Sequence, residues 1–376
     1  MASTDTLVIG AGPAGLAMAG RLTMAGRAYH LIEKSDRLVN AWHRHYTRLH
    51  LHSTRRFSAL PGMPFPRSFP RFVPRLRFID YCIDYAEHFG IRPEYGAVAR
   101  RIAPGPDGWV TTLADGRSIA SRHVVIATGL NHVPNVPDWP GFDTFAGSNC
   151  HSRDYRDGEP FRGRTVLVVG MGNTGAEIAL DLAEHGARPI ISVRGAVNIV
   201  RRTVLGSATT DTALLLEKSR LPRCVVDGFA NLFQKLTVGD LSRYGLETRR
   251  ESPTRQQRSR GATPTIDVGT VAAIKAGRIA VRTGIDRFEG ERVWFVDGRE
   301  ERIDAVILAT GYRPDLGPLL AEVEGIEAFL DGNGTPTDLW SPEHPGLYFL
   351  GFSYCLSGLL YCIGQDSGRI LRDMEG

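Results

Sequence analysis

The sequence has few lysines, scattered cysteines and no long apolar run. Lysine occurs at only four positions among 45 basic residues, so the net charge of +4 is carried by arginine and reflects composition more than an anionic partner. The five cysteines form no Cys-x-x-Cys pair and give neither a disulfide framework nor a zinc site. No apolar stretch has membrane-spanning length, and no basic leader with a cleavage site precedes the first strand. We expect a soluble, unprocessed cytoplasmic protein, and 376 residues suffice for two domains.

The segment TLVIGAGPAGLAMAGRL predicts an apolar strand, a glycine turn and a helix. Gly10, Gly12 and Gly15 form G-x-G-x-x-G, in which the glycines allow a tight turn, close approach of a pyrophosphate and helix-to-strand packing. The helix N-terminus offers free N–H groups to the phosphates. The next strand ends in Glu33, whose carboxylate can accept hydrogen bonds from ribose hydroxyls. This pattern predicts a dinucleotide-binding unit.

The same pattern returns in RTVLVVGMGNTGAEIALDLAEHGARPIISVRG, with Gly170, Gly172 and Gly175 as its glycines. Here the second strand ends in Ser192 and Arg194 instead of a carboxylate. A carboxylate suits a free 2′-hydroxyl, whereas arginine pairs with a 2′-phosphate. The first unit is therefore expected to bind FAD and the second NADPH.

Apolar strands near Gly129 and Gly311 both end in Ala-Thr-Gly, and GLYFLG after the second one predicts a further strand. An Asp-Gly turn joins two short strands ahead of Gly129. We expect an α/β fold with two Rossmann-like domains, in which the NADPH domain is inserted into the FAD domain. The expected segments are residues 1–160 (FAD), 161–300 (NADPH) and 301–376 (FAD).

Two nucleotide sites in one chain indicate electron transfer from a nicotinamide through a flavin. The missing Cys-x-x-Cys argues against a redox-active disulfide as acceptor. Three alternatives are left: oxygenation of a substrate, reduction of a quinone or protein partner, and a redox sensor that binds both cofactors without catalysis. No Ser-His-Asp or Cys-His arrangement suggests a nucleophilic side chain.

The segment FAGSNCHSRDY, expected to connect the domains, matches F-x-G-x-x-x-H-x-x-x-Y through Phe145, Gly147, His151 and Tyr155. This pattern resembles the fingerprint of flavin-containing monooxygenases, in which the segment links the domains and helps to hold the nicotinamide against the flavin. Residues 42–91 and 261–281 also resemble the YUCCA-type plant monooxygenases and their bacterial relatives. The second glycine loop is similar as well, with Asn173 and Glu177 at matching positions.

The resemblance implies that NADPH reduces FAD, that a C4a-(hydro)peroxyflavin forms with dioxygen, and that a small organic substrate is oxygenated. The substrate would be a 2-oxo acid such as indole-3-pyruvate, or an N- or S-nucleophile. The chain departs from the plant enzymes at Ala262, where they usually have Lys, and at Leu130-Asn131-His132, where they have Glu-Asn-Ala. The Baeyer–Villiger relatives usually have Trp at the position of Tyr155.

Asn131 is the candidate for steadying the flavin adduct, and a turn asparagine that bonds its own backbone is the alternative. Trp42 is expected near the isoalloxazine or in the core, and polar contacts beside the flavin are expected for Arg48 and His50. The four histidines of HRHYTRLHLH lack further ligands, so no metal is expected. RRESPTRQQRSRG is interpreted as a solvated loop and not as a nucleic-acid site. The expected partners are the substrate and dioxygen, without nucleic acid or membrane, and a homodimer is left open. The expected cofactor-binding residues are Gly10, Gly12, Pro13, Ala14, Gly15, Glu33, Lys34, Trp42, Arg48, His50, Thr128, Gly129, Gly170, Gly172, Asn173, Thr174, Gly175, Ser192, Arg194, Thr310, Gly311 and Gln365.

Overall fold

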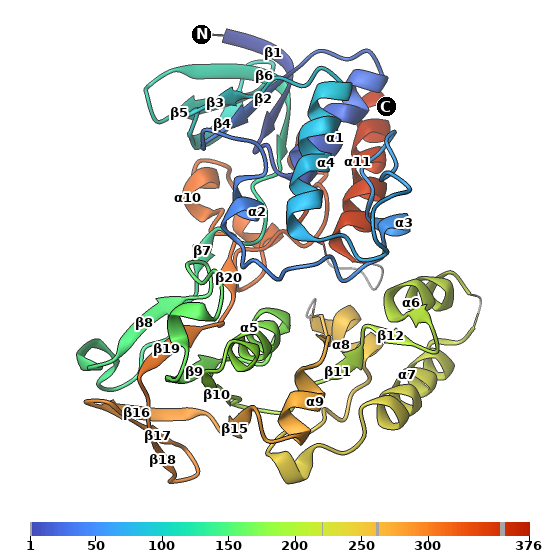
Figure 1. The fold of residues 1–376 in the computed structure, drawn as a ribbon. Coiled ribbons are helices and arrows are strands. Elements are labelled where there is room, and N and C mark those ends of the chain that lie inside the picture. The colour runs from blue at the N-terminus through green and yellow to red at the C-terminus, as the bar shows by residue number, and fades with distance from the viewer. Residues whose placement is uncertain (1, 220, 261–262, 354–357) are drawn as a thin grey trace. The chain divides into compact units, whose positions relative to one another are not determined.

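The computed structural model describes residues 2–219, 221–260, 263–353 and 358–376. The chain forms two compact units (Figure 1). Unit 1 comprises Met1–His43, Ser53–Val133 and Tyr312–Gly376, and unit 2 comprises Arg44–His52 and Pro134–Gly311. The chain therefore passes between the units four times.

Unit 1 is built on a seven-stranded sheet in the order β3-β2-β1-β6-β5-β4, with β21 paired to β6. Its strands are β1 (Ala2–Ile9), β2 (Tyr29–Glu33), β3 (Glu94–Tyr95), β4 (Ala99–Gly105), β5 (Gly108–Leu113), β6 (Ser118–Ile126) and β21 (Leu347–Phe349). Strand β1 runs parallel to β2 and β6, and its last four residues are buried because helices and loops cover both faces of the sheet there. The Asp-Gly turn joins the antiparallel strands β5 and β6, as the sequence predicts.

The helices of unit 1 include α1, which follows β1, and α11, which packs against α1. They are α1 (Pro13–Met24), α3 (Arg55–Ser58), α4 (Arg75–His88), α10 (Gly317–Leu320) and α11 (Leu359–Glu375), and α2 (Asn40–Arg44) ends at the boundary with unit 2. A side-chain hydrogen bond from Arg21 Nη2 to the Gly364 carbonyl joins α1 to α11 at 3.1 Å. Strands β7 (Val133–Pro134) and β20 (Tyr312–Arg313) form a two-stranded sheet.

Unit 2 contains a five-stranded parallel sheet in the order β15-β10-β9-β19-β8. The strands are β8 (Ser148–His151), β9 (Thr165–Val169), β10 (Arg188–Ser192), β15 (Ala280–Arg282) and β19 (Ala305–Leu308). Helix α5 (Asn173–Glu184) connects the parallel strands β9 and β10 and completes a βαβ unit. The antiparallel strands β16 (Ile285–Glu289), β17 (Arg292–Phe295) and β18 (Glu300–Arg302) form a separate sheet.

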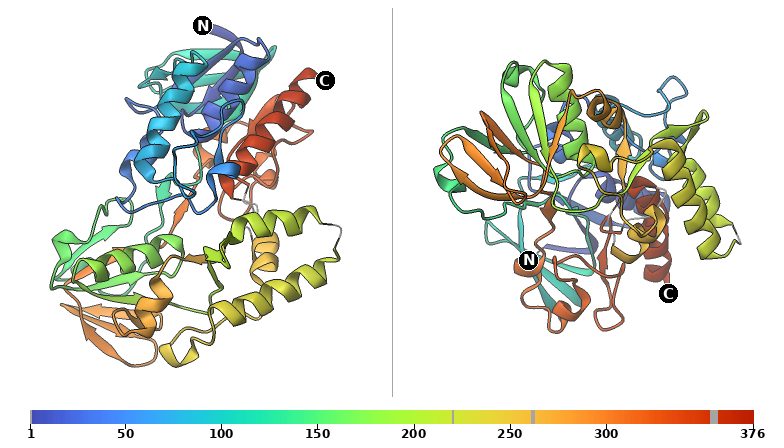
Figure 2. Two further views of the ribbon diagram at one scale, coloured as in Figure 1. Left: turned by 45° about the vertical axis from the view of Figure 1, so that its right-hand side comes forward. Right: turned by 90° about the horizontal axis from the view of Figure 1, so that it is seen from below.

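A mainly helical region of unit 2 lies between β10 and β15 (Figure 2). Its helices are α6 (Thr209–Lys218), α7 (Arg223–Thr237), α8 (Pro253–Arg260) and α9 (Thr270–Lys275). Two short strand pairs belong to it, β11 (Ile199–Arg201) with β14 (Thr265–Asp267) and β12 (Thr203–Val204) with β13 (Ser207–Ala208). A 3-10 turn in this region spans Ser242–Tyr244, and further 3-10 turns of the chain span Phe142–Thr144, Glu159–Phe161 and Ile326–Phe329.

The structure revises three expectations about organisation. Unit 2 begins its long segment at residue 134 and not near 160, because β8 pairs with β19 in the second sheet. It ends at residue 311 and not near 300, because β19 pairs with β9. The connecting segment expected at residues 145–155 therefore contains an edge strand, β8, of the second sheet.

The cysteines also differ from expectation. Cys362 is disulfide-bonded, whereas Cys82, Cys150 and Cys224 are free thiols. Cys355 lies outside the described residues, as does Ala262, where the chain departs from the plant enzymes. The expectation that the cysteines form no disulfide was therefore wrong for Cys362. The spacing of cysteines in a sequence does not show which of them come close together in the folded chain. Within the described part of the chain, no helix is long and apolar enough to cross a membrane.

Candidate functional site

The glycine loop of unit 1 lies between β1 and α1, and two of its three glycines are required by the chain itself. Gly10 has φ +106°, and a Cβ there would lie 2.7 Å from the Ala127 carbonyl oxygen at the end of β6. A Cβ on Gly15 would lie 1.8 Å from the Gly10 carbonyl oxygen. Both positions must therefore stay glycine for the turn and the first helical turn to pack.

Gly12 differs from its two neighbours in the motif. Its φ of −78° and ψ of −176° suit any residue, and a Cβ would meet no atom within 4 Å. No contact with the described residues requires glycine here, at the residue that precedes the first turn of α1. The open space fits a ligand whose pyrophosphate approaches the backbone at the helix N-terminus, where unpaired N–H groups and the helix dipole favour an anion.

Glu33 ends β2 beside this loop and is buried. Its Oε2 accepts a hydrogen bond from the Ala11 N–H at 2.8 Å, and its Oε1 accepts one from the Ser35 N–H at 2.9 Å. The carboxylate is thus held in one orientation at the carboxyl end of the sheet, the edge at which doubly wound folds bind their ligands. Each oxygen retains further acceptor capacity for a ribose hydroxyl.

The glycine loop of unit 2 repeats this geometry. Gly170 has φ +109°, and a Cβ there would lie 2.7 Å from the Ala309 carbonyl oxygen at the end of β19. A Cβ on Gly175 would lie 2.0 Å from the Gly170 carbonyl oxygen. Gly172, with φ −76° and ψ 179°, again has an ordinary backbone and no atom within 4 Å of its missing Cβ. Unit 2 therefore contains a second loop of the same kind. We call each of these glycine loops, together with the helix N-terminus that follows it, a cradle.

The residues around the second cradle are fixed by contacts with β14 and α9. Asn173 Oδ1 accepts a hydrogen bond from the Ile266 N–H at 2.6 Å, and Thr270 Oγ1 donates to the Ala176 carbonyl at 2.8 Å. Ser192 is buried, and its hydroxyl donates to the Thr283 carbonyl at 2.8 Å. The Arg194 side chain is exposed beyond the end of β10 and makes no hydrogen bond or ion pair with the described residues.

The four fingerprint residues each have a defined place within unit 2. Phe145 is buried, with its ring 5.4 Å from that of Phe288. Gly147 packs so closely that a Cβ would lie 2.5 Å from the Phe145 ring and 2.8 Å from the Asp304 carbonyl oxygen. The pattern F-x-G thus encodes the packing of the chain just before β8.

His151 is buried at the end of β8. Its Nε2 lies 3.2 Å from the Gly311 carbonyl oxygen, and its Nδ1 accepts a hydrogen bond from the Arg153 N–H at 3.2 Å. These partners assign the tautomer with the proton on Nε2. Burial lowers the pKa of His151, and the contact with Gly311 opposes that effect. A neutral His151 therefore holds the turn that follows β19, next to the second cradle.

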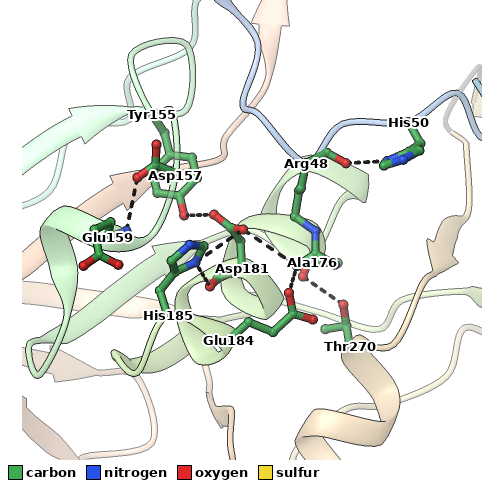
Figure 3. A network of polar contacts seen from close by, with 10 residues as sticks. All are labelled: Arg48, His50, Tyr155, Asp157, Glu159, Ala176, Asp181, Glu184, His185 and Thr270. Atoms are coloured by element: carbon green, nitrogen blue, oxygen red, sulfur yellow. Dashed lines mark hydrogen bonds and ion pairs between the residues drawn. The ribbon is translucent and has the colours of Figure 1, made fainter. Parts of the chain in front are cut away.

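Tyr155 and a charged network on α5 fix the segment 44–52 (Figure 3). The Tyr155 hydroxyl donates to Asp181 Oδ2 at 2.6 Å, and both residues are buried. Arg48 Nη1 lies 2.7 Å from Glu184 Oε2 and 3.9 Å from Asp181 Oδ1. Figure 3 shows these groups converging on one side of α5, which is how a segment distant in sequence becomes part of unit 2.

A third carboxylate of α5, Glu177, binds the other end of this segment. His52 Nε2 lies 2.5 Å from Glu177 Oε1, and Glu177 is buried. Tyr46 is also buried; burial raises its pKa well above the ordinary value, and the nearby Glu177 raises it further. Sequence reasoning missed Tyr46, His52 and Asp181 as a group. The available signal was the helical spacing of acidic residues at 177, 181 and 184 within an otherwise apolar segment.

The remaining predicted site residues occupy both units. Trp42 is half-buried in unit 1, with its ring 4.3 Å from that of Phe78, whereas Arg48 and His50 belong to unit 2. His50 Nδ1 contacts the Arg48 carbonyl at 2.6 Å. Four of the predicted residues have exposed side chains in unit 1: Lys34, Thr128, Asn131 and Gln365. Six others lie in or beside the two cradles: Pro13, Ala14, Gly129, Thr174, Thr310 and Gly311. Among the described residues, no group of three or more His, Cys, Asp or Glu could hold a metal ion.

Two glycine cradles, each backed by an Ala-Thr-Gly turn, define a class of protein that binds two dinucleotides in one chain. Comparison with known proteins specifies the class. The family model for flavin-binding monooxygenase-like proteins matches residues 30–328, and a model for FAD-binding domains matches residues 3–48. This chain therefore belongs to the flavin-binding monooxygenase-like family.

Relatives cover nearly the whole chain. Indole-3-pyruvate monooxygenase YUCCA1 of Oryza sativa subsp. japonica is 38% identical over 378 residues, which is 98% of this chain and 91% of that protein. YUCCA6 of Arabidopsis thaliana is 38% identical over 385 residues, covering 99% and 90%. A flavin-containing monooxygenase of Stenotrophomonas maltophilia shares the fold with a TM-score of 0.74 at 22% identity, covering 99% of each chain. The OTEMO complex with FAD and NADP aligns with a TM-score of 0.74 at 18% identity, covering 99% of this chain and 85% of that one.

These findings confirm the expected fold class of two Rossmann-like domains and the expected reaction class. The protein is an NADPH-dependent flavin monooxygenase with FAD as its flavin, and it acts on a small organic substrate with dioxygen. These findings support oxygenation of a substrate, the first of the three alternatives left by the sequence.

Proposed function

We propose that unit 1 holds FAD and that unit 2 holds NADPH. In unit 1, Gly12 leaves room for the pyrophosphate and Glu33 accepts hydrogen bonds from the adenosine ribose. In unit 2, Gly172 leaves the same room and Arg194 pairs with the 2′-phosphate. The single observation that carries this assignment is the difference near the end of the second strand of each unit, where unit 1 has the buried carboxylate of Glu33 and unit 2 has the exposed guanidinium of Arg194.

Bound FAD would accept hydride from NADPH and would activate dioxygen for the transfer of one oxygen atom to the substrate. The chain contributes position, charge and exclusion of water. Asn131 follows β6 in unit 1 with an exposed side chain, so its amide is available to donate or accept a hydrogen bond beside the flavin. His151 and Tyr155 act on the nicotinamide site indirectly, by fixing the turn at Gly311 and the position of α5.

The proposed substrate is an aromatic 2-oxo acid such as indole-3-pyruvate. The support is identity of 38% over 98% of the chain to an indole-3-pyruvate monooxygenase. The balanced reaction consumes the 2-oxo acid, dioxygen, NADPH and a proton. It yields the carboxylic acid shortened by one carbon, carbon dioxide, NADP⁺ and water, with one oxygen atom of dioxygen entering the new carboxylate.

The test is incubation of the flavin-loaded protein with NADPH, ¹⁸O₂ and indole-3-pyruvate, followed by mass spectrometry of the products. We expect indole-3-acetate that carries one ¹⁸O atom, with one NADPH consumed per product. Peroxide released from ¹⁸O₂ also carries ¹⁸O and decarboxylates 2-oxo acids in solution, so the reaction is repeated with catalase, which should leave the yield unchanged. Loss of the labelled acetate on addition of catalase would mean that released peroxide decarboxylates the oxo acid outside the protein. In that event, amines and sulfides become the substrates to measure.

The expectations of a cytoplasmic location and of no nucleic-acid partner stay predictions from the sequence.

A further inference from the structure

One peptide bond of the second cradle is held in place by a side chain from another part of unit 2. This bond joins Met171 to Gly172, and the Met171 carbonyl accepts a hydrogen bond from the Thr265 hydroxyl of β14. The carbonyl and the N–H of a trans peptide point in opposite directions, so the Gly172 N–H is directed away from Thr265. This N–H makes no hydrogen bond with the described residues, and a Cβ on Gly172 would meet no atom within 4 Å. The donor is therefore left for a ligand.

The first cradle holds the matching peptide bond by a different donor. There the Ala11 carbonyl accepts a hydrogen bond from the Val39 N–H at 3.0 Å, and the Gly12 N–H that follows makes none with the part of the chain that the structure describes. A backbone donor survives every substitution except proline. In unit 2 the same task depends on one hydroxyl, which a single substitution removes.

The peptide bond after Met171 needs this support because glycines lie on both sides of that residue. Glycine has few steric limits on its backbone angles, so the chain between Gly170 and Gly172 can rotate at little cost. Met171 is buried, and a buried carbonyl without a hydrogen-bond donor is unfavourable. Without the Thr265 hydroxyl, we expect the carbonyl to turn toward another donor. The Gly172 N–H would then turn with it, because the peptide group is planar.

Thr265 is itself fixed by the segment to which it belongs. It is buried, and it takes part in the pairing of β14 with β11. The next residue, Ile266, donates its N–H to Asn173 Oδ1 at 2.6 Å. At the start of α9, the Thr270 hydroxyl donates to the Ala176 carbonyl at 2.8 Å. The segment 265–270 therefore holds both the glycine loop and the first turn of α5.

We propose that Thr265 is a positioning residue for the nicotinamide cofactor. Its hydroxyl fixes the peptide between Met171 and Gly172, so that the Gly172 N–H faces the pyrophosphate of NADPH. This inference rests on the proposed assignment of NADPH to unit 2. The pyrophosphate is common to NADPH and NADH, so loss of the hydroxyl weakens the binding of both nucleotides to the same extent. Arg194, in contrast, distinguishes the two nucleotides through the 2′-phosphate.

The test is anaerobic rapid mixing of the flavin-loaded protein with increasing concentrations of NADPH or NADH. The rate of flavin reduction gives a Kd and a limiting rate for each nucleotide, and no oxygenation substrate is needed. We expect Thr265→Val to raise the Kd of both nucleotides by the same factor, several-fold to about tenfold, and to leave the limiting rate close to that of the wild type. Thr265→Ser keeps the hydroxyl and should restore the wild-type Kd.

Thr270→Val is the matched control, because it removes a buried hydroxyl from the same segment. Its partner, the Ala176 carbonyl, belongs to α5, whose N–H groups beyond the first turn are bonded within the helix and are not offered to a ligand. Thr270→Val should therefore lower the Tm without changing either Kd. Thr265→Ala also lacks the hydroxyl and replaces Thr265→Val if circular dichroism shows that the valine variant does not fold.

A wild-type Kd in Thr265→Val with flavin bound would overturn the proposal and leave the assignment of the cofactors intact. An equally large rise in Kd for Thr265→Ser or for Thr270→Val would also overturn it, because the effect would then not depend on the hydroxyl at residue 265. Loss of flavin from Thr265→Val during purification, together with an unchanged affinity for NADPH, would place FAD in unit 2. That result would overturn the cofactor assignment and this inference together.

Discussion

Replacing Tyr155 with phenylalanine should destabilise unit 2 by a defined amount. The Tyr155 hydroxyl donates to Asp181 Oδ2 at 2.6 Å, and both groups are buried. The substitution keeps the ring, which stacks 5.9 Å from Phe161, and removes only the donor. A hydrogen bond to a charged group contributes about 1.5–3 kcal/mol, and the loss leaves a buried carboxylate oxygen without that donor. Arg48, at 3.9 Å from the other oxygen of Asp181, does not replace the lost donor at that distance.

The assay is urea denaturation followed by circular dichroism, supported by thermal melting. For a unit of this size, about 1.5–3 kcal/mol corresponds to a fall in Tm of roughly 3–12 °C. The control is Tyr244→Phe in the same unit, because the Tyr244 hydroxyl makes no hydrogen bond with the described residues. That change should alter the free energy of unfolding by less than about 0.5 kcal/mol.

Equal stability of Tyr155→Phe and Tyr244→Phe would refute the reasoning. It would mean that Asp181 finds an equivalent donor after the substitution, or that Tyr155 serves the bound nicotinamide and not the apoprotein. In the second case, NADP⁺ should stabilise the wild type more than Tyr155→Phe, which a melting experiment with and without NADP⁺ detects.

Three further predictions follow from single residues. Gly12→Val should yield a folded protein without flavin, since a Cβ at this position has no neighbour within 4 Å in the part of the chain that the structure describes. A yellow variant at purification would contradict the assignment of FAD to unit 1. Arg194→Ala should raise the KM for NADPH on the order of tenfold and leave the KM for NADH unchanged, as expected for loss of a phosphate contact. If steady-state kinetics show an unaltered ratio of these two KM values, Arg194 does not belong to the site. His123 is buried with no hydrogen-bond partner for either ring nitrogen among the described residues, and burial lowers its pKa. The unfolded chain therefore binds a proton below about pH 6.5 that the folded chain does not, so the free energy of unfolding should fall as pH drops below that value. His123→Phe should show a smaller fall between pH 7 and 5 in urea titrations, and an identical pH profile would count against this account.

The local elements were predictable because each depends on a short stretch of sequence. The strand, turn and helix around Gly10 and around Gly170 are encoded within about twenty residues each, and the Asp-Gly turn specifies the β5–β6 hairpin. The fold class followed from the repetition of that pattern. The expected cofactors followed from one residue near the end of the second strand of each unit, Glu33 for FAD and Arg194 for NADPH.

The assignment of segments to units was not predictable in the same way. Residues 44–52 join unit 2 because Arg48 and His52 pair with Glu184 and Glu177, contacts that span more than a hundred residues of sequence. No pattern within HRHYTRLHLH indicates those partners. The sequence boundary near 160 was wrong for a related reason: β8 is an edge strand of four residues, and its membership in the second sheet depends on pairing with β19 about 150 residues later. Short edge strands carry little periodicity of their own.

The order in which the two units become complete during synthesis follows from the path of the chain. Unit 2 contains no residue after Gly311, so all of its chain is available before Tyr312–Gly376 of unit 1 are made. Unit 1 starts with the first strand, yet β21, which pairs with β6, and α11, which packs against α1, come from the last thirty residues. Unit 1, whose first strand leaves the ribosome first, is therefore completed last. Until then β6 lacks its partner strand β21, and α1 lacks its contact with α11. A truncation within α11 would consequently remove the helix that packs against α1 in unit 1 and leave unit 2 with its full set of strands.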